Sequence, residues 1–262
     1  MENIKRVAVV TGGTRGMGKG ISIELARRGN IVCPIYHSNK KAAEETLEIL
    51  LQYSPSSCII QGDVSKESEV KRIINEIGEK FGRIDILVNN AGIFDFSYID
   101  EMSEEYLDRV INTNFKSQFF MIKHTAPYMK KQQYGRIVGA SSISGSFADC
   151  GLVAYAASKA GVNMLTKIAA AELGPFGITV NAYAPGIIAT DMTAEMIKER
   201  GEEQVRDLCL KEFGTPQDVG ALVGFLTSPE ARYITGEIIG IDGGMFKVQN
   251  AYLAYERSQK ES

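Results

Sequence analysis

Short apolar segments alternate with longer segments of helical periodicity along almost the whole chain. The first short segment, residues 7–11, is apolar at nearly every position, as expected for a strand buried on both faces of a sheet. Comparable segments predict further strands at residues 31–36, 57–61, 84–89, 136–140, 178–182 and 237–241.

Between these strands, apolar residues recur three or four positions apart, which is the spacing of one helix face. The spacing predicts helices at residues 16–28, 40–52, 66–80, 103–131, 155–173 and 216–226, and one at 190–211 that Gly201 interrupts. Gly29 stands at the C′ position of the first helix, and Pro216 stands near the start of the last. This alternation predicts an α/β fold, with a parallel sheet covered by helices on both faces.

A length of 262 residues fits one large domain of this class. We expect residues 1–247 to form it, because no linker, repeat or low-complexity segment divides them. Residues 248–262 form a polar tail that carries Tyr252, Leu253 and Tyr255. The tail is either a frayed end or an arm that packs on a neighbouring subunit.

Charge and hydropathy exclude several functions. The net charge is −3 and the basic residues are scattered, which argues against binding to nucleic acid or to an anionic membrane surface. No apolar run approaches the roughly 20 residues of a membrane span. The N-terminus leads directly into the first strand without the features of a signal peptide, so we expect a cytoplasmic protein.

The four cysteines are far apart in the sequence, and no CxxC pair occurs among Cys33, Cys58, Cys150 and Cys209. With only His37 and His124 as histidines, no zinc-ligand spacing is present, so we expect reduced thiols and no metal site. Cys150 lies between two candidate catalytic residues described below and could line a pocket.

A glycine-rich loop joins the first strand to the first helix, with the sequence TGGTRGMG at residues 11–18. Gly12 permits the tight turn, Gly16 lets the backbone approach a pyrophosphate, and Gly18 lets helix and strand pack closely. The helix N-terminus offers free N–H groups to the anion. The location after an apolar strand predicts a dinucleotide site, against the alternative of a turn without a ligand.

The end of the second strand indicates which dinucleotide is preferred. NAD-specific sites usually place an acid there, but this chain has His37, Ser38 and Asn39. Arg15 lies in the glycine-rich loop, and its planar guanidinium suits the oxygens of a 2′-phosphate. We therefore predict NADP(H) in preference to NAD(H), with NAD possible.

Tyr155 and Lys159 stand four residues apart in the segment YAASK, thirteen residues after Ser142. On a helix these two side chains share a face. A cation about 5 Å from a phenol is worth roughly 3 kcal/mol at an effective dielectric of about 20, enough to lower the pKa by about two units. Such a phenol can exchange a proton with an alcohol or a carbonyl. The alternative is a surface lysine beside a half-buried tyrosine.

These motifs, in this order, resemble the short-chain dehydrogenase/reductase family in its single-domain branch, from about residue 7 to residue 244. The other landmarks are Asp63-Val64, the segment NNAG at 89–92, Asn114, Pro185-Gly186, Thr235-Gly236 and the segment DGG at 242–244. The resemblance implies a doubly wound, Rossmann-like sheet of seven parallel strands.

The resemblance also implies roles for individual residues. Tyr155 would be the general acid in reduction, Ser142 would hydrogen-bond the substrate oxygen, and Lys159 would bind the nicotinamide ribose and lower the pKa of Tyr155. Asn114 would hold a water that links Lys159 to solvent, a role compatible with a polar residue that caps or kinks its helix. The implied cofactor contacts are Gly12, Thr14, Arg15, Gly16, Met17, Gly18, His37, Ser38, Asn39, Asp63, Val64, Asn90, Ala91, Gly92, Tyr155, Lys159, Pro185, Gly186, Ile188 and Thr190.

Within the family, the segment PGIIATDM at 185–192 is similar to that of 3-oxoacyl-acyl-carrier-protein reductases. This similarity implies NADP(H)-dependent interconversion of a ketone and a secondary alcohol, with a 3-oxoacyl thioester as the expected substrate. Such reductases hold arginines that grip the carrier protein where this chain has Gln133 and Phe176, and the lid segment 209–213 also departs from their pattern. The acyl carrier protein is therefore a doubtful partner.

Two alternative functions stay open. One is a dehydrogenase of another secondary alcohol, such as a small alcohol or diol, a hydroxysteroid or a sugar alcohol. The other is a non-catalytic dinucleotide-binding sensor or scaffold, which we would expect to lack the tyrosine or the lysine. A largely apolar set could surround the substrate or pack elsewhere, namely Phe94, Phe96, Phe147, Cys150, Met192 and Met196.

By resemblance we expect a homotetramer or homodimer, built through the long helices that follow the fourth and fifth strands. Apolar residues on those helices could form this interface or could face the chain's own sheet. They are Phe115, Phe119, Phe120 and Met164.

Overall fold

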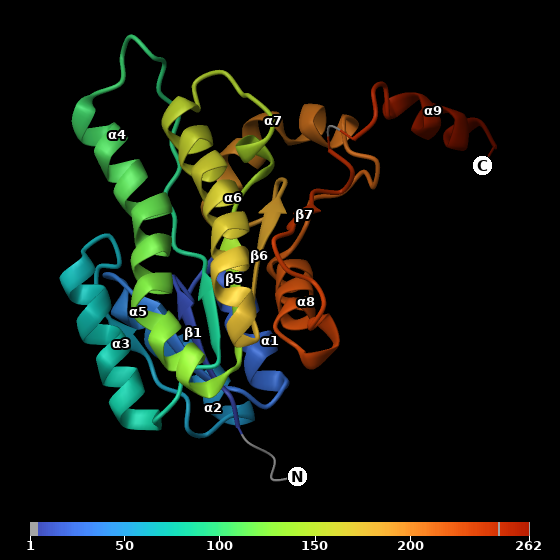
Figure 1. The fold of residues 1–262 in the computed structure, drawn as a ribbon. Coiled ribbons are helices and arrows are strands. Elements are labelled where there is room, and N and C mark those ends of the chain that lie inside the picture. The colour runs from blue at the N-terminus through green and yellow to red at the C-terminus, as the bar shows by residue number, and fades with distance from the viewer. Residues whose placement is uncertain (1–4, 246, 262) are drawn as a thin grey trace.

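A computed structural model describes residues 5–245 and 247–261. Its centre is one sheet of seven parallel strands, as predicted, with helices packed around it (Figure 1). The strand order is β3-β2-β1-β4-β5-β6-β7. The strands are β1 (Val7–Thr11), β2 (Ile31–Tyr36), β3 (Ile60–Gln61), β4 (Ile86–Asn89), β5 (Gly135–Ala140), β6 (Ile178–Pro185) and β7 (Ile238–Ile241). The order reverses between β1 and β4, and a crevice at the carboxyl ends of the strands forms at such a point.

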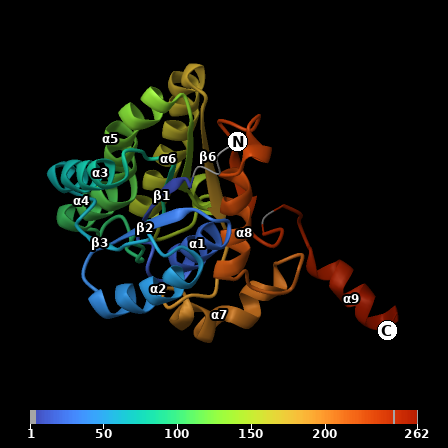
Figure 2. The ribbon, with the colours of Figure 1, turned by 90° about the horizontal axis from the view of Figure 1, so that it is seen from below.

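Helices cover both faces of the sheet, which Figure 2 shows from below. One face carries α1 (Gly16–Arg27), α2 (Lys40–Tyr53) and α8 (Pro216–Leu226). The other carries α3 (Glu67–Phe81), α5 (Ser117–Gln132) and α6 (Val153–Leu173), with α4 (Glu104–Ile111) packed against α6. The remaining helices are α7 (Ala194–Arg206), α9 (Tyr252–Glu261) and the short turns η2 (Ile143–Gly145), η3 (Gly174–Phe176) and η4 (Pro229–Ala231).

The uninterrupted apolar character of β1 follows from these two layers. Val7 and Val9 belong to the core on the α3 and α5 side, whereas Ala8 and Val10 belong to the core on the α1 and α8 side. All four side chains are buried, because successive residues of a strand point to opposite faces. No helix in the described part of the chain has the length and apolar character needed to cross a bilayer.

Three predicted elements differ in the structure. The strand predicted at 57–61 is paired only at Ile60–Gln61, and the helix predicted at 103–131 is divided by a π-helical segment, η1 (Asn112–Lys116). The predicted interruption at Gly201 is wrong, because α7 runs through it. A Cβ at this position would lie 3.3 Å from Cγ2 of Ile197, so the glycine serves close packing.

The C-terminal tail is helical in α9, which the sequence pattern did not predict. The helix extends away from the domain in both views (Figures 1 and 2). The guanidinium of Arg206 lies 5.0 Å from the ring centre of Tyr252, and the Lys211 amine lies 5.4 Å from that of Tyr255. Two cation–π contacts therefore join the tail to the end of α7 and the loop after it.

Candidate active site

A cavity of about 840 Å³ lies at the carboxyl ends of the central strands. Fifteen predicted cofactor residues line it: Gly12, Thr14, Arg15, Gly16, Met17, Gly18, His37, Ser38, Asn39, Asp63, Val64, Asn90, Ala91, Gly92 and Thr190. Residues from five separate chain segments therefore meet in one concave surface, as expected at the topological switch point of such a sheet.

Five predicted cofactor contacts are not among the residues that line the cavity, namely Tyr155, Lys159, Pro185, Gly186 and Ile188. Pro185 ends β6, and the Ile188 side chain is buried in the core beside α8. The backbone of Ile188 instead forms an isolated bridge with Gly214. The segment after β6 reaches the cavity at Thr190, which lines it. A Cβ at Gly16 would lie 3.4 Å from Cγ2 of Thr190.

The glycine-rich loop is shaped by contacts that leave no room for side chains. A Cβ at Gly18 would lie 2.1 Å from the carbonyl oxygen of Gly12, and Gly12 itself has a φ of +60°. The amide of Asn90 donates to the carbonyls of Thr11 and Gly12, each at 3.1 Å, and so holds the loop against β4. No side chain caps the N-terminus of α1, which leaves its first N–H groups for an anion. These features fit a bound dinucleotide.

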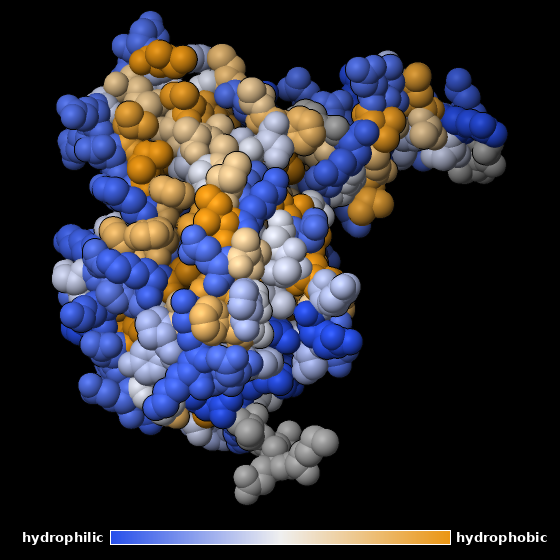
Figure 3. Space-filling view, in the orientation of Figure 1, coloured by the Kyte–Doolittle hydropathy of each residue, from blue (hydrophilic) through white to orange (hydrophobic). Residues whose placement is uncertain are grey.

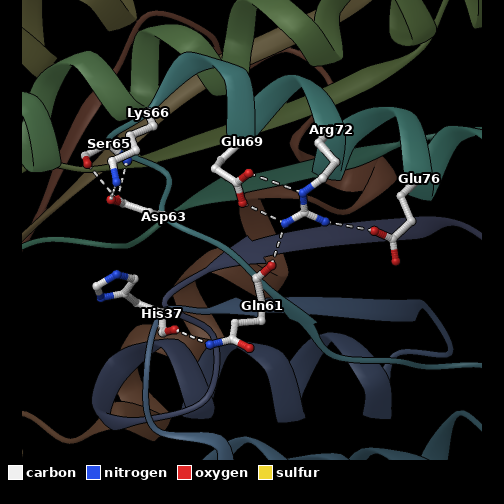
Figure 4. Close-up of polar contacts among 8 residues, drawn as sticks. All are labelled: His37, Gln61, Asp63, Ser65, Lys66, Glu69, Arg72 and Glu76. Atoms are coloured by element: carbon white, nitrogen blue, oxygen red, sulfur yellow. Dashed lines mark hydrogen bonds and ion pairs between the residues drawn. The ribbon is translucent and has the colours of Figure 1, made fainter.

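A polar network fixes the β2–β3 edge of the cavity (Figure 4). Gln61 Nε2 donates to the carbonyl of His37 at 3.0 Å, and Arg72 Nη2 donates to the carbonyl of Gln61 at 2.8 Å. Arg72 also forms ion pairs with Glu69 and Glu76 along α3. The His37 backbone is therefore tied to α3 through one glutamine and one arginine.

Asp63 is the acidic residue at this end of the cavity. Partial burial opposes its ionisation, but hydrogen bonds from Ser65 and the charges of His37 and Lys66 outweigh that effect and lower the pKa of the carboxyl. The Ser65 hydroxyl and backbone N–H donate to Oδ1 at 2.6 and 3.0 Å. Asp63 is thus ionised and already partnered at neutral pH.

The loop after β2 carries no carboxylate, since it consists of His37, Ser38 and Asn39. Asn39 Oδ1 accepts from the Ala42 N–H at 3.0 Å and caps α2. Arg15 is exposed and lines the same cavity, and no ion pair involving it occurs in the described ranges. The cavity thus has a free arginine, and the loop after β2 adds no carboxylate beyond the partnered Asp63.

Three of the four predicted catalytic side chains, Ser142, Tyr155 and Lys159, lie together near the end of β5. Ser142 follows this strand and caps η2, and its hydroxyl forms a hydrogen bond with Tyr155. Lys159 lies one turn further along α6, with its amine 5.4 Å from the centre of the Tyr155 ring. The spacing of the three residues in the sequence therefore places them in one cluster.

The ionisation of the cluster differs from the prediction. Burial raises the pKa of Tyr155, and the hydrogen bond from Ser142 offsets this only in part. The predicted lowering by Lys159 is not found, because the Lys159 amine donates to the carbonyl of Ala140 at 2.9 Å. Burial also lowers the pKa of Lys159, to about 8. At neutral pH the phenol therefore keeps its proton beside an amine that is still mostly charged.

Asn114 is fully buried in the π-helical segment and links three parts of the site. Its Oδ1 accepts from the N–H of Ile93 at 2.8 Å, and its Nδ2 donates to the Ile93 carbonyl at 2.9 Å and to Ser158 Oγ at 3.2 Å. A Cβ at Gly92 would lie 3.3 Å from Asn114 Oδ1 and 3.7 Å from Lys159 Nζ. The residue lies in the deformed part of its helix, in agreement with the structural role expected for it.

Apolar side chains border the phenol. The rings of Phe94 and Tyr155 meet edge to face at 5.3 Å, and Phe96 packs in the same way on Phe94 at 5.2 Å. Phe94 and Met192 line the cavity, whereas Cys150 is exposed and is not part of the lining. The wall beside the reacting group is thus aromatic and partly open to solvent.

Two residues with clear roles were absent from the sequence-based prediction. The hydroxyl of Thr11 accepts from the N–H groups of Asn90 and Ala91, both at 2.9 Å. The buried hydroxyl of Tyr183 donates to Oδ1 of Asn90 at 2.9 Å. A threonine directly before the glycine-rich loop gave a local signal for the first, but nothing local identifies the second. No group of acidic, histidine or cysteine side chains within the described chain could hold a metal ion.

Comparisons with known proteins agree with this geometry. The family model described as enoyl-(acyl carrier protein) reductase matches residues 12–246. The chain is 41% identical over 243 residues to the 3-oxoacyl-acyl-carrier-protein reductase of Staphylococcus epidermidis, covering 93% of this chain and 100% of that protein. The corresponding reductase of Thermotoga maritima is 37% identical, with 92% and 97% of the two chains covered.

Solved structures with other substrates in their names are also similar. A putative gluconate dehydrogenase from Agrobacterium tumefaciens superposes with a TM-score of 0.88 at 31% identity, covering 93% of this chain and 96% of that one. Levodione reductase superposes with a TM-score of 0.86 at 30% identity, covering 91% and 96%. The fold is therefore shared by enzymes with different named substrates.

The buried amine gives a prediction about stability. The unfolded chain binds a proton at Lys159 up to its ordinary pKa of 10.5, whereas the folded chain releases it at about 8. The free energy of unfolding should therefore rise between these pH values, by about 3 kcal/mol from this group. Urea unfolding at a series of pH values measures the difference in the free energy of unfolding between the wild type and Lys159→Met, and this difference should change by about 3 kcal/mol across the stated pH range. For the exposed Lys131→Met, the difference should not change with pH. A pH-independent difference for Lys159→Met would contradict the lowered pKa of the buried amine.

Proposed function

Because the chain belongs to the short-chain dehydrogenase/reductase family of nicotinamide-dependent oxidoreductases, we propose that it uses NADPH to reduce the keto group of a 3-oxoacyl thioester. The observation that carries this proposal is the cluster of Ser142, Tyr155 and Lys159 next to the nucleotide-sized cavity. The thioester substrate is supported by the named activity of the curated relatives, at 37–42% identity.

The proposed chemistry divides between the cofactor and the chain. The bound nicotinamide supplies the hydride that reduces the keto carbon. Ser142 donates a hydrogen bond to the keto oxygen, and Tyr155 transfers its proton to that oxygen as negative charge develops. The Lys159 ammonium then stabilises the phenolate, and Asn114 helps to hold the path by which a proton returns.

The ionisation of Tyr155 favours the reducing direction. A general acid must hold its proton until the substrate needs it, and burial raises the pKa of this phenol. The hydrogen bond from Ser142 and the attraction of the Lys159 charge stabilise Tyr155 most strongly once its phenolate has formed. The raised pKa thus supports reduction of a ketone as the direction of the reaction.

NADP(H) is the cofactor that we propose in preference to NAD(H). Arg15 is exposed and lines the cavity, and the loop of His37, Ser38 and Asn39, which also lines it, carries no acid. A 2′-phosphate beside this loop would find a planar cation and no carboxylate from the loop itself. We also propose a cytoplasmic location, where the reduced thiols of this chain would persist.

A dehydrogenase of another secondary alcohol is the second candidate. Gln133 and Phe176 stand where similar reductases carry arginines for the carrier protein, and the Lys130 amine lies 4.5 Å from the centre of the Phe176 ring. Structurally similar enzymes are named for gluconate and levodione, which supports a ketone or alcohol other than a thioester. Comparing NADPH oxidation on acetoacetyl thioesters, small diketones, steroid ketones and sugars separates the two candidates.

We further propose that two copies associate through α5 and α6. Figure 3 shows apolar side chains gathered over these helices. Phe119, Met164 and Ile168 are 45%, 57% and 50% exposed, which is unusual for large apolar side chains on one face. Phe120 instead packs against the core, and Phe115 lies against α6 at Gly161. The predicted set is thus divided between the surface and the interior.

Replacing the phenol tests the proposed acid. Tyr155→Phe should lower kcat by about 10²- to 10⁴-fold and leave the binding of NADPH nearly unchanged, because only the proton donor is lost. Steady-state kinetics on acetoacetyl thioester and fluorescence titration with NADPH measure the two effects. Tyr233→Phe, at a residue that is 92% exposed, is the matched control and should behave as the wild type. A Tyr155→Phe enzyme with most of its activity would refute the role.

Removing the loop cation tests the cofactor preference. Arg15→Ala should raise the KM for NADPH by about tenfold or more and hardly change that for NADH, because a charged hydrogen bond is worth about 1.5–3 kcal/mol. Arg27→Ala changes an arginine of the same helix that does not line the cavity and should leave both constants unchanged. A wild-type enzyme that prefers NADH would overturn the preference.

Charge on the apolar face tests the association. Phe119→Glu and Met164→Glu should convert a dimer or tetramer into a smaller species, because a carboxylate cannot be buried there without a partner. Size-exclusion chromatography with light scattering measures the mass of each species. Tyr233→Glu adds the same charge at an exposed tyrosine that belongs to neither helix and should leave the mass unchanged. A wild-type monomer at micromolar concentration would contradict the proposal.

A further inference from the structure

Two cysteines that are distant in the sequence face each other across the β2–β3 edge of the sheet. Ile35 pairs with Ile60 in the parallel register, so Cys33 stands opposite Cys58 two residues earlier on both segments. The N–H of Cys58 donates to the carbonyl of Val32 at 3.2 Å, which continues the pairing beyond the short β3. The two sulfur atoms lie 3.7 Å apart.

The two thiols differ in exposure and in ionisation. Cys33 is fully buried, whereas Cys58 is partly exposed. The hydrogen bond between the two sulfur atoms, assisted by the Lys80 amine of α3, lowers the pKa of Cys58 to about 6 against the opposing effects of burial and of Glu76. The same hydrogen bond and burial raise the pKa of Cys33. An accessible thiolate therefore stands beside a buried, protonated thiol.

We propose that Cys33 and Cys58 are a redox-responsive pair, which a low-molecular-weight disulfide oxidises to an intramolecular disulfide beside the adenosine end of the cavity. The Cys58 thiolate attacks one sulfur of glutathione disulfide, and one glutathione leaves as a thiolate. Cys33 then loses its proton, and its sulfur attacks Cys58 Sγ and releases the second glutathione. The protein loses two electrons and the proton of Cys33, and one glutathione disulfide becomes one glutathione thiol and one glutathione thiolate, which takes from solvent the proton that Cys58 had released.

The strand geometry permits this bond. Neighbouring strands lie about 4.7–4.9 Å apart, which falls within the about 4.4–6.8 Å that separates the Cα atoms of most disulfides. The sulfur atoms must approach from 3.7 Å to about 2.05 Å, so the bond needs a local shift of both segments. Disulfides in a reducing compartment are usually transient or redox-sensing, and a pair that closes only on oxidation fits that use.

The pair lies directly upstream of the nucleotide-binding loops. His37 comes four positions after Cys33, and Asp63 comes five positions after Cys58; both His37 and Asp63 line the cavity. Gln61 joins the two loops through the carbonyl of His37 (Figure 4). We expect the shift of the two segments to weaken NADPH binding several-fold, an effect that rests on the proposed function, whereas the disulfide itself does not.

Oxidation of a chain without its other thiols tests the pair directly. Cys150→Ser and Cys209→Ser together remove the two exposed cysteines. After incubation of this full-length double variant with glutathione disulfide, peptide mapping by mass spectrometry should find Cys33 joined to Cys58, and dithiothreitol should reverse the bond. Cys58→Ser in the same background should abolish the cross-link. Stable glutathionylation of Cys58 without a cross-link, or two unreacted thiols, would overturn the proposal.

The reactivity of Cys58 gives a second measurement that needs no cross-link. The rate of its alkylation by iodoacetamide should follow a titration near pH 6, as the pKa of Cys58 indicates. Lys80→Gln should move this midpoint to higher pH, whereas Lys71→Gln, an exposed lysine of the same helix, should not move it. Alkylation that rises only near the ordinary thiol pKa in the unsubstituted protein would contradict the activated thiolate.

Titration with NADPH separates this inference from the proposed function. The reduced double variant should bind NADPH, and the oxidised form should bind it several-fold more weakly, with recovery after dithiothreitol. If the reduced form does not bind NADPH, the proposed function fails while the peptide map still decides the thiol pair. Equal affinity in the reduced and the fully cross-linked forms would overturn the coupling to the cavity.

Discussion

The arrangement of the site depends on the buried side-chain amide of Asn114, whose oxygen and nitrogen are both hydrogen-bonded. Asn114 is fully buried, and its two polar atoms bond both backbone groups of Ile93 as well as the hydroxyl of Ser158. A buried amide costs free energy unless it is satisfied, so these bonds fix the loop after β4 relative to α6. Ser158 precedes Lys159, and Ile93 precedes Phe94, which contacts Tyr155. The position of Tyr155, the proposed acid, therefore depends on the hydrogen bonds of Asn114.

The backbone around Asn114 is π-helical rather than α-helical. Asn112–Lys116 forms wider turns between α4 and α5, and single π turns are rare except at functional sites. Gln118 donates to the carbonyls of Asn114 and Ala140, so the deformed helix is also bonded to the end of β5. Lys159 donates to the same Ala140 carbonyl. Hydrogen bonds thus connect the end of β5, the π-helical segment and the side chains of Gln118 and Lys159.

The features that the sequence predicted are those that depend on neighbouring residues. Continuous apolar strands imply burial on both faces, and the glycines of the loop are required by backbone geometry such as the positive φ of Gly12. The missed features depend on contacts between distant segments. The hydroxyl of Tyr183 bonds Asn90 across the sheet, and the lack of a side chain at Gly201 leaves room for Ile197. Cys33 meets Cys58 only through the register of their strands. No local pattern contains this information.

The ionisation of Tyr155, the proposed acid, also depends on such contacts between distant segments. The spacing of Tyr155 and Lys159 places both on one helix face, but the amine bonds the Ala140 carbonyl at 2.9 Å and lies 5.4 Å from the ring centre. Desolvation then acts on both groups and favours the neutral form of each, raising the pKa of the phenol and lowering that of the amine. Attraction between ammonium and phenolate gains its full value only after the proton has left the phenol. The pair therefore stabilises the state that follows proton transfer more than the state that precedes it, which is what catalysis requires of an acid.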